Sequence, residues 1–151
     1  MAERVFAAVY PGLTANFDAG RLRALGIAAA ELLDHGAEYA ARCIDAAQAL
    51  GRSLHEAGMH ILGADRGFTE SHHLAVAVPD AMTGDSAVRR LERAGVFVSA
   101  TQLADAGGPL TALRLGTQEL VRRGFGPTDM PDIASLIARV LAEPPRSIAV
   151  G

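Results

Sequence analysis

Apolar residues recur at helical spacing over a long stretch near the start of the chain. From about Ala19 to Ala57 they return every three or four residues, which places them along one face of an α-helix. The positions in this series are Leu25, Ala29, Leu32, Gly36, Ala40, Cys43, Ala47, Leu50 and Leu54. At about 1.5 Å per residue the predicted helix extends more than about 50 Å, which exceeds the expected width of the remaining domain. We therefore expect it either to bend near Gly36 or to project beyond its own domain and pack against a second body.

A short apolar segment precedes this helix. Residues 5–9 are apolar and are followed by Pro11-Gly12, which predicts a strand that ends in a turn. The loop at 13–18 then leads into the helix, with Asn16 or Asp18 as its N-cap. The pattern thus divides the chain into residues 1–57, with the strand, loop and long interface helix, and residues 58–151, a small α+β domain.

In the second region, short apolar runs alternate with amphipathic ones. Strands are expected at residues 60–62, 74–78, 96–99 and 113–115, with a glycine-rich loop at 105–109. Helices are expected from Thr83 or Asp85 to just before Gly95, from Thr117 to Arg123, and from Thr128 or Asp129 to Pro144. This order predicts an α+β fold, in which a long N-terminal helix precedes a small, largely antiparallel sheet with helices on one face.

Composition excludes one group of mechanisms and several kinds of partner. All 14 basic residues of the 151-residue chain are arginine, so the chain alone has no lysine for a Schiff base and no P-loop lysine. The net charge of −3 gives no reason to expect a nucleic acid as partner. The single Cys43 excludes an internal disulfide and favours a reducing, cytoplasmic location. No apolar run predicts a membrane span, and residues 1–6 do not resemble a signal peptide.

Arg114 interrupts the apolar strand at 113–115, just before a predicted helix start. One interpretation is a guanidinium that binds a substrate carboxylate through two parallel hydrogen bonds. The other is an arginine on an edge strand whose side chain points into water. The spacing alone does not decide between these two interpretations.

His72 and His73 lie at the entry to the strand at 74–78. Neighbouring residues of an unbroken strand face opposite sides of the sheet, so the two histidines are not expected to bind one metal ion. No second group of Cys or His supplies further ligands. We therefore predict no metal site and expect at most one of the two to line a pocket, with His73 as the candidate for substrate binding.

Three other features have simpler explanations than a functional site. Cys43 belongs to the apolar series of the long helix, which favours a buried thiol over a nucleophile. Arg122-Arg123 complement the dipole at the end of a short helix. The glycines at 107–108 form too common a pattern to indicate phosphate binding.

Two segments together resemble the C-terminal part of serine (glycine) hydroxymethyltransferases, which are fold type I enzymes dependent on pyridoxal phosphate (PLP). Val9-Tyr10-Pro11-Gly12-Leu13, followed by an alanine-rich helix, resembles the family's Val-Phe-Pro-Gly segment just after the Schiff-base lysine. Leu113-Arg114-Leu115-Gly116-Thr117, followed by Arg122-Arg123-Gly124-Phe125, resembles the family's Ile-Arg-(Ile/Val)-Gly-Thr-Pro and Arg-Gly-Phe run. His73-Leu74 and the last helix, at 133–140, match the family's Asn-His-Leu strand start and closing helix.

The resemblance implies roles for particular residues. Arg114 would be the catalytic arginine that binds the carboxylate of the amino-acid substrate, and His73 would be the second substrate-binding residue. Pro11-Gly12 would lie near a subunit interface beside a cofactor phosphate. A shorter loop replaces the family's Gln-Gly-Gly-Pro, and there Thr14 or Asn16 would contact that phosphate. The segment at 100–111 is unlike the family's folate-holding loop, so a tetrahydrofolate-linked hydroxymethyl transfer and a folate-free transaldol exchange both fit.

The family's large domain, which carries the Schiff-base lysine, has no counterpart in this chain. The resemblance therefore implies the small subunit, or C-terminal half, of a split enzyme that is inactive alone. A separate lysine-bearing chain would supply most of the PLP site. The two chains would perform aldol-type chemistry on a small amino acid, in an expected heterotetramer. The alternative is a non-catalytic module that stabilises or regulates a PLP enzyme.

Overall fold

Two compact units make up the chain in the computed structural model. The structure describes residues 1–13, 18–105 and 108–142. Contacts group the chain into a first unit, Met1–Ala37, and a second unit, Glu38–Gly151. Over the described ranges, no helix is both long enough and apolar enough to cross a lipid bilayer.

The long helix α2 (Ala19–Glu56) contributes residues to both units. The periodic apolar series predicted this helix with nearly the observed ends. The sequence divides the chain after Ala57, whereas the contacts divide it just past Gly36. Burial explains the difference, because α2 has no buried residue before Cys43 and contributes to the core from there to Leu54.

The first unit buries none of its described residues. It contains α1 (Ala2–Ala7), the π-helical turn η1 (Ala8–Leu13) and the first half of α2. The strand predicted at 5–9 is wrong, because a segment rich in alanine, with Glu3 in its first turn, favours a helix. The large exposed apolar residues of this unit are Met1, Val5, Phe6, Val9, Tyr10, Leu13, Leu22, Leu25, Ile27, Leu32 and Leu33.

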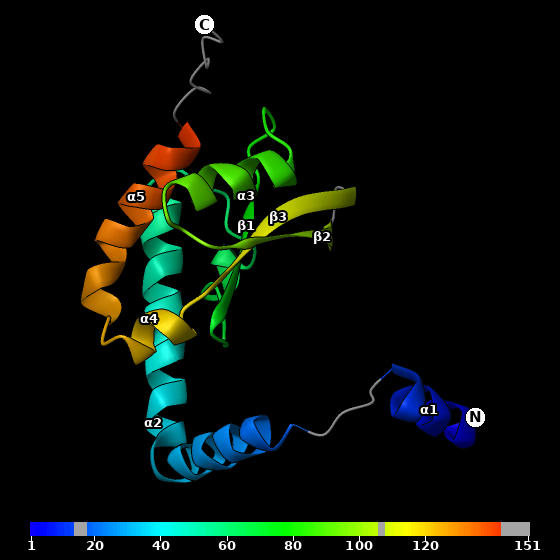
Figure 1. Ribbon diagram of the computed structural model, residues 1–151. Coiled ribbons are helices and arrows are strands. Elements are labelled where there is room, and N and C mark those ends of the chain that lie inside the picture. The colour runs from blue at the N-terminus through cyan, green and yellow to red at the C-terminus, as the bar shows by residue number, and fades with distance from the viewer. Residues whose placement is uncertain (14–17, 106–107, 143–151) are drawn as a thin grey trace, which may run out of the picture. The chain divides into compact units, whose positions relative to one another are not determined.

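A three-stranded antiparallel sheet with the strand order β1-β3-β2 lies in the second unit (Figure 1). The strands are β1 (His73–Ala77), β2 (Ser99–Asp105) and β3 (Gly108–Gly116). The central strand β3 pairs Arg114 with Ala75 on one side and with Ser99 on the other. The α+β class and the small antiparallel sheet predicted from the sequence are confirmed.

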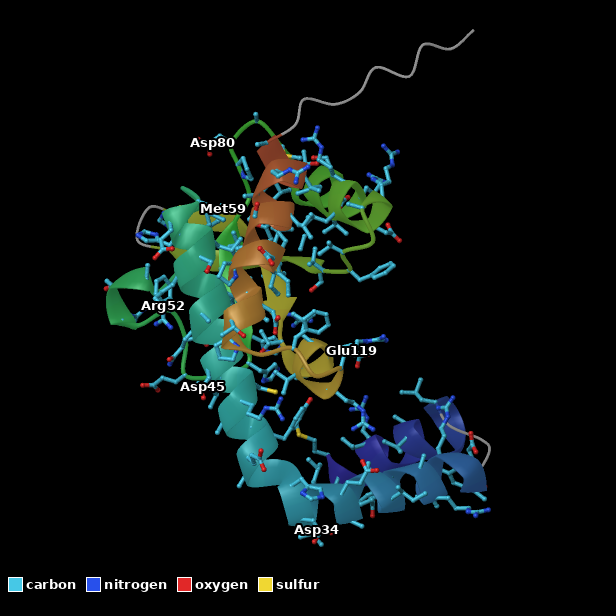
Figure 2. All side chains as sticks on the ribbon, turned by 90° about the vertical axis from the view of Figure 1, so that its left-hand side faces the viewer. Asp34, Asp45, Arg52, Met59, Asp80 and Glu119 are labelled. Atoms are coloured by element: carbon cyan, nitrogen blue, oxygen red, sulfur yellow. The ribbon has the colours of Figure 1, made fainter. Side chains whose placement is uncertain are left out.

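One face of the sheet packs into the core. The buried residues Leu74 and Val76 of β1 and Leu113 and Leu115 of β3 stand two positions apart on each strand and pair with each other, so they share this face. They pack with buried residues of α2, α3 (Gly84–Arg93) and α5 (Met130–Ala142) in one cluster. Figure 2 shows two charged side chains of α2 in this unit, Asp45 and Arg52, directed away from that core.

The N-terminus of α3 is capped as predicted. The hydroxyl of Thr83 accepts a hydrogen bond from the backbone N–H of Ser86 at 3.2 Å, and the hydroxyl of Ser86 accepts one from the N–H of Thr83 at 3.0 Å. This reciprocal arrangement satisfies two of the donors that a helix start leaves unpaired.

Three predicted strands differ from the observed ones. The strand expected at 113–115 is part of β3, which begins at Gly108 inside the segment predicted as a loop. Residues 60–62 form no strand and make only an isolated bridge from Ile61 to Val76, beside the outer edge of β1. The strand expected at 96–99 begins instead at Ser99 and continues to Asp105. The remaining elements are the short helix α4 (Gln118–Arg122) and the 3-10 turns η2 (Ala64–Arg66) and η3 (Pro127–Asp129).

Candidate functional site

Arg114 stands on the sheet face opposite the core. Along β3 it lies between the buried Leu113 and Leu115, and it is itself exposed. Its partners across the sheet, Ala75 and Ser99, have small side chains that leave the guanidinium accessible. Because β3 is the central strand, the interpretation of Arg114 as an edge-strand residue is wrong.

No acidic side chain pairs with Arg114 among the described residues. The ion pairs recorded there involve Arg21, Arg66 and Arg123, each with a carboxylate close in sequence. A guanidinium presents several N–H donors in a planar fork that matches a carboxylate or a phosphate. The position of Arg114 therefore favours an anionic ligand from outside this unit.

His72 and His73 approach each other instead of facing opposite sides of the sheet. The Nε2 atoms of the two rings are 3.0 Å apart, and the ring centroids are 3.7 Å apart. The prediction that they point apart is wrong, because β1 begins at His73 and His72 lies in the bend before it. The alternation of side chains holds only inside a strand. No cluster of three or more metal-binding side chains occurs within the described ranges.

Gly116 makes room for the side chain of Gln118 beside His73. A Cβ atom on Gly116 would lie 2.6 Å from Oε1 of Gln118 and 3.5 Å from Cδ2 of His73. A larger residue would therefore displace the Gln118 amide. The backbone carbonyl of Gln118 accepts a hydrogen bond from the hydroxyl of Tyr39 at 3.0 Å, which links the start of α4 to α2.

Thr117 fixes the end of β3 to helix α2. Its side chain is buried, and its hydroxyl donates a 2.8 Å hydrogen bond to the backbone carbonyl of Cys43. Its backbone N–H donates to the carbonyl of His72 at 3.1 Å. Thr117 does occupy the N-cap position of α4, as predicted, but its hydroxyl makes no capping bond because it is already directed at α2. This one residue thus connects the Arg114 strand, the histidine pair and the long helix.

The loop before β1 is pinned to α2 by Phe68. Gly51 of α2 provides the space, since a Cβ there would lie 2.9 Å from Cβ and Cγ of Phe68. Phe68 has a φ of 73°, in the left-handed region that is unfavourable for a residue with a large side chain. A hydrogen bond of 3.0 Å from Nε2 of Gln48 to the carbonyl of Thr69 adds a second attachment. The loop that delivers His72 and His73 is therefore held at two points.

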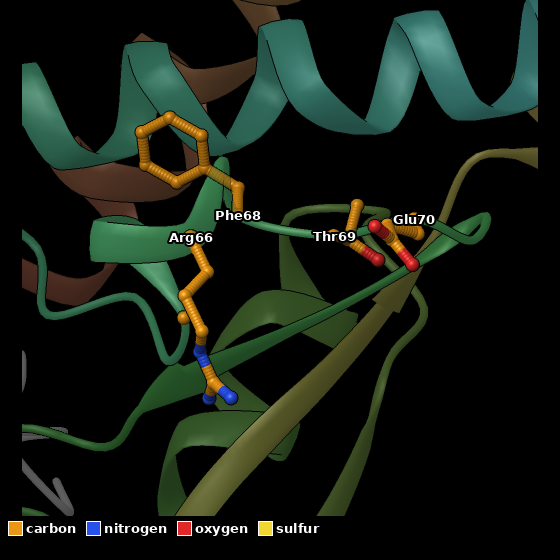
Figure 3. Close-up of a pocket in the computed structure, with 5 residues that line it drawn as sticks. Arg66, Phe68, Thr69 and Glu70 are labelled. Carbon is orange, nitrogen blue, oxygen red and sulfur yellow. The ribbon is translucent and has the colours of Figure 1, made fainter.

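Two shallow hollows occur elsewhere on the second unit. The first, of about 320 Å³, is lined by Gly63, Arg66, Phe68, Thr69 and Glu70, and Figure 3 shows the ring of Phe68 directed toward α2. The second, of about 530 Å³, is lined by Met82, Thr83, Gly84, Asp85, Ala100, Thr101, Gln102 and Thr111. Neither includes Arg114 or His73, so the candidate site is an open face rather than a closed pocket.

The structure brings together only part of the predicted site. Arg114 and His73 lie on the same sheet face, two positions apart in the strand register. Thr14 and Asn16 lie outside the described residues. Cys43 is a buried free thiol, in agreement with the packing role expected for it. The sequence did not indicate Gln118, whose place beside His73 depends on the absence of a side chain at the neighbouring Gly116.

Comparisons with known proteins address the identity of this fold. No known protein-family profile matches the chain. An alpha-methylserine aldolase from Variovorax paradoxus is 44% identical over 144 residues, which cover 94% of this chain and 33% of the relative. A serine hydroxymethyltransferase from Methanothermobacter thermautotrophicus is 35% identical over 147 residues, which cover 95% of this chain and 35% of the relative.

A solved structure extends this similarity to three dimensions. The L-threonine transaldolase from Pseudomonas fluorescens, solved in its internal aldimine state, matches with a TM-score of 0.75 and 32% identity over 88% of this chain and 30% of that one. The resemblance to serine hydroxymethyltransferase-like, fold type I PLP enzymes is thereby confirmed. The chain spans about a third of the length of the curated relatives it matches.

Proposed function

We propose that this chain is the small subunit of a heteromeric, PLP-dependent enzyme that makes or breaks an aldol-type bond in a small amino acid. The observation that carries the proposal is Arg114, an exposed guanidinium on the central strand of an open sheet face, with no acidic partner among the described residues. The relatives support it, because they are an aldolase, a hydroxymethyltransferase and a transaldolase acting on hydroxylated amino acids by name.

In this proposal Arg114 binds the substrate carboxylate through two parallel N–H···O hydrogen bonds. Both bonds are charge-assisted, and the planar geometry fixes the orientation of the amino acid. Orientation matters because the bond to be broken must align with the π system of the cofactor. The rigid strand pairing of Arg114 with Ala75 and Ser99 supports this positioning role.

PLP, when bound, acts as the electron sink for the bond that breaks at the α-carbon. This chain has no lysine, so it forms no covalent bond to the cofactor by itself. We propose that a second, lysine-bearing chain holds most of the cofactor, with Thr14 or Asn16 near its phosphate. The exposed apolar residues of the first unit support a heteromer, since apolar surface of that extent is typical of an interface. By the family's architecture, the assembly contains two copies of each chain.

The test is to compare Arg114→Ala and Arg114→Lys with Arg66→Ala in the complete assembly. Arg66 is a matched control, because it is an exposed arginine paired only with the exposed Asp65. Each charge-assisted bond is worth about 1.5–3 kcal/mol, so loss of both should lower kcat/KM for the amino acid roughly 100- to 10,000-fold. The lysine variant keeps the positive charge but loses the planar guanidinium with its two parallel N–H donors, so its kcat/KM should lie between those of the alanine variant and the wild type.

Two results would contradict the proposal. Unchanged kcat/KM in Arg114→Ala would favour a non-catalytic, stabilising module instead. Visible absorbance from covalently bound PLP in the isolated chain would contradict the two-chain assignment. Assays with tetrahydrofolate and with a free aldehyde acceptor, run side by side on the assembly, distinguish hydroxymethyl transfer from transaldol exchange.

A further inference from the structure

The contact between His72 and His73 constrains how many protons the pair carries. Two Nε2 atoms 3.0 Å apart form a hydrogen bond only if one ring donates its N–H and the other accepts with a lone pair. A neutral pair satisfies this condition, and a singly protonated pair satisfies it with a stronger, charge-assisted bond. A doubly protonated pair would place two N–H groups and two positive charges against each other. The geometry therefore suits the uptake of one proton and opposes a second.

The pair lies beside Arg114 on the same sheet face. His73 is opposite Gly116 in the β1–β3 ladder, and Arg114 is two positions along β3, opposite Ala75. Such diagonal neighbours are about 7–8 Å apart, which is within reach of long side chains. The side chain of Gln118 occupies the space beside Gly116, but its amide carries no charge. The charge on Arg114 therefore still acts on the imidazole of His73.

The charged groups that act on His73 are few. Partial desolvation of the ring lowers the pKa of His73 most, followed by His72 and then by Arg114. The other groups that touch the pair in the described structure are neutral. They are the hydroxyl of Ser71, which accepts a hydrogen bond from the N–H of His73 at 3.1 Å, and the backbone N–H of Thr117, which donates to the carbonyl of His72 at 3.1 Å. No described carboxylate offsets the charge of Arg114 at this position.

We propose that the His72–His73 pair takes up a proton from solvent when a carboxylate binds to Arg114, so that the pair couples substrate binding to protonation. This rests on the carboxylate-binding role proposed for Arg114. A bound carboxylate neutralises the guanidinium and adds an acceptor near His73, so the part of the penalty on protonating His73 that comes from Arg114 is removed, while desolvation and His72 still act. The proton goes to the Nδ1 lone pair of the ring that donates, and the Nε2–H···Nε2 hydrogen bond to the second imidazole is kept as a charge-assisted bond. His73 is thereby a proton-carrying positioning residue beside the reacting amino acid.

The sign of the resulting pH dependence follows from linkage. Since the pair binds its proton more tightly with the carboxylate present, affinity for the carboxylate increases as the pH falls through the pKa of the pair in the complex. The affinity levels off below the pKa of His73 in the free protein, which desolvation, His72 and Arg114 lower from the ordinary histidine value of about 6.5. Each unit of difference between the two pKa values corresponds to about a tenfold change in affinity.

The experiment is an NMR titration of the complete assembly in which only this chain carries histidine labelled at Cε1. The chain has five histidines, so their signals can be followed separately, and His35, His55 and His60 serve as internal controls. Glycine is the probe, because it has a carboxylate but no β-hydroxyl and so no aldol bond to break. Methylamine, which lacks the carboxylate, is the matched control ligand. Glycine should raise the pKa of the pair, and methylamine should not.

Calorimetry of glycine binding in two buffers of different ionisation enthalpy measures how many protons the assembly takes up for each glycine that binds. Wild-type assembly should take up as much as one proton per glycine near the pKa of the pair, and His60→Asn should match it. His73→Asn should take up none while still binding glycine. If the pair titrates identically with and without saturating glycine, the coupling is refuted even though Arg114 still binds the carboxylate. If Arg114→Ala binds glycine as tightly as wild type, the proposed function itself fails.

Discussion

Replacing Thr117 with valine should destabilise the protein through one buried hydrogen bond. Valine has nearly the shape of threonine, so the change removes the hydroxyl that donates to the Cys43 carbonyl at 2.8 Å and keeps the volume. A net hydrogen bond contributes about 0.5–1.5 kcal/mol. The new methyl also stands where the hydroxyl was, and a carbon–oxygen contact prefers about 3.3–3.6 Å, so some strain is added. We expect a loss of about 1–2 kcal/mol in the free energy of unfolding.

The measurement is urea unfolding of the chain followed by circular dichroism, with Thr117→Ser and Thr117→Asp as companions. Serine keeps the donor and loses one methyl, which should cost about 1 kcal/mol from lost burial. Aspartate is a good N-cap but has no donor when ionised, so it should be the most destabilising of the three. If Thr117→Val unfolds like wild type, the hydrogen bond to Cys43 contributes no stability and our reasoning is wrong. If Thr117→Asp is tolerated, the hydroxyl acts as a helix cap instead.

Other changes test the packing, the pH response and the exposed surface. Gly84→Ala should lower the free energy of unfolding by about 1–3 kcal/mol, because the new Cβ would lie 2.8 Å from Cγ2 of Thr111. As a control, a Cβ on Gly26 meets nothing within 4 Å, so Gly26→Ala should raise the free energy of unfolding by up to about 1 kcal/mol, and chemical denaturation measures both variants. Burial, and then a hydrogen bond with Cys43, raise the pKa of Tyr39 above 10.0, so the stability that Tyr39 contributes is complete below about pH 10 and is lost as the pH rises through the raised pKa. Tyr39→Phe should therefore lose less stability than wild type at alkaline pH. If the two proteins lose stability equally as the pH rises, this prediction is wrong. Leu25→Gln, at a side chain 64% exposed, should leave unfolding within about 0.5 kcal/mol of wild type yet weaken association with the partner chain at least about tenfold, as measured by analytical ultracentrifugation.

Local sequence patterns predicted the elements whose interactions are themselves local. The apolar series gave α2, and Thr83 gave the start of α3, because helix periodicity and capping depend on residues a few positions apart. Residues 60–62 look like a strand by composition but make only a bridge, since strand formation depends on a neighbour that is distant in sequence. The apolar run at 5–9 was ambiguous for the same reason, as short apolar runs fit both a helix and a strand.

In the candidate site, too, the sequence predicted what depends on local patterns and missed what depends on residues distant in sequence. Arg114 was identifiable because a charged residue interrupts an apolar strand, but its place on the central strand depends on pairing with both β1 and β2. The histidine pair was misjudged because a shift of one residue in the start of β1 decides whether His72 follows the alternation of the strand. Thr117 was expected to cap a helix that follows it, and only the tertiary fold supplies the Cys43 carbonyl as a better partner.

The absence of buried side chains among the described residues of the first unit has a consequence for how a cell must produce this protein. A chain that presents Phe6, Leu25 and Leu33 to water is a substrate for proteases and a seed for aggregation. In the proposed heteromer, copies made in excess of the partner should therefore be removed by quality control, while paired copies persist. We then expect the steady-state amounts of the two chains to match closely whatever their rates of synthesis, with the proposed partner acting as a chaperone.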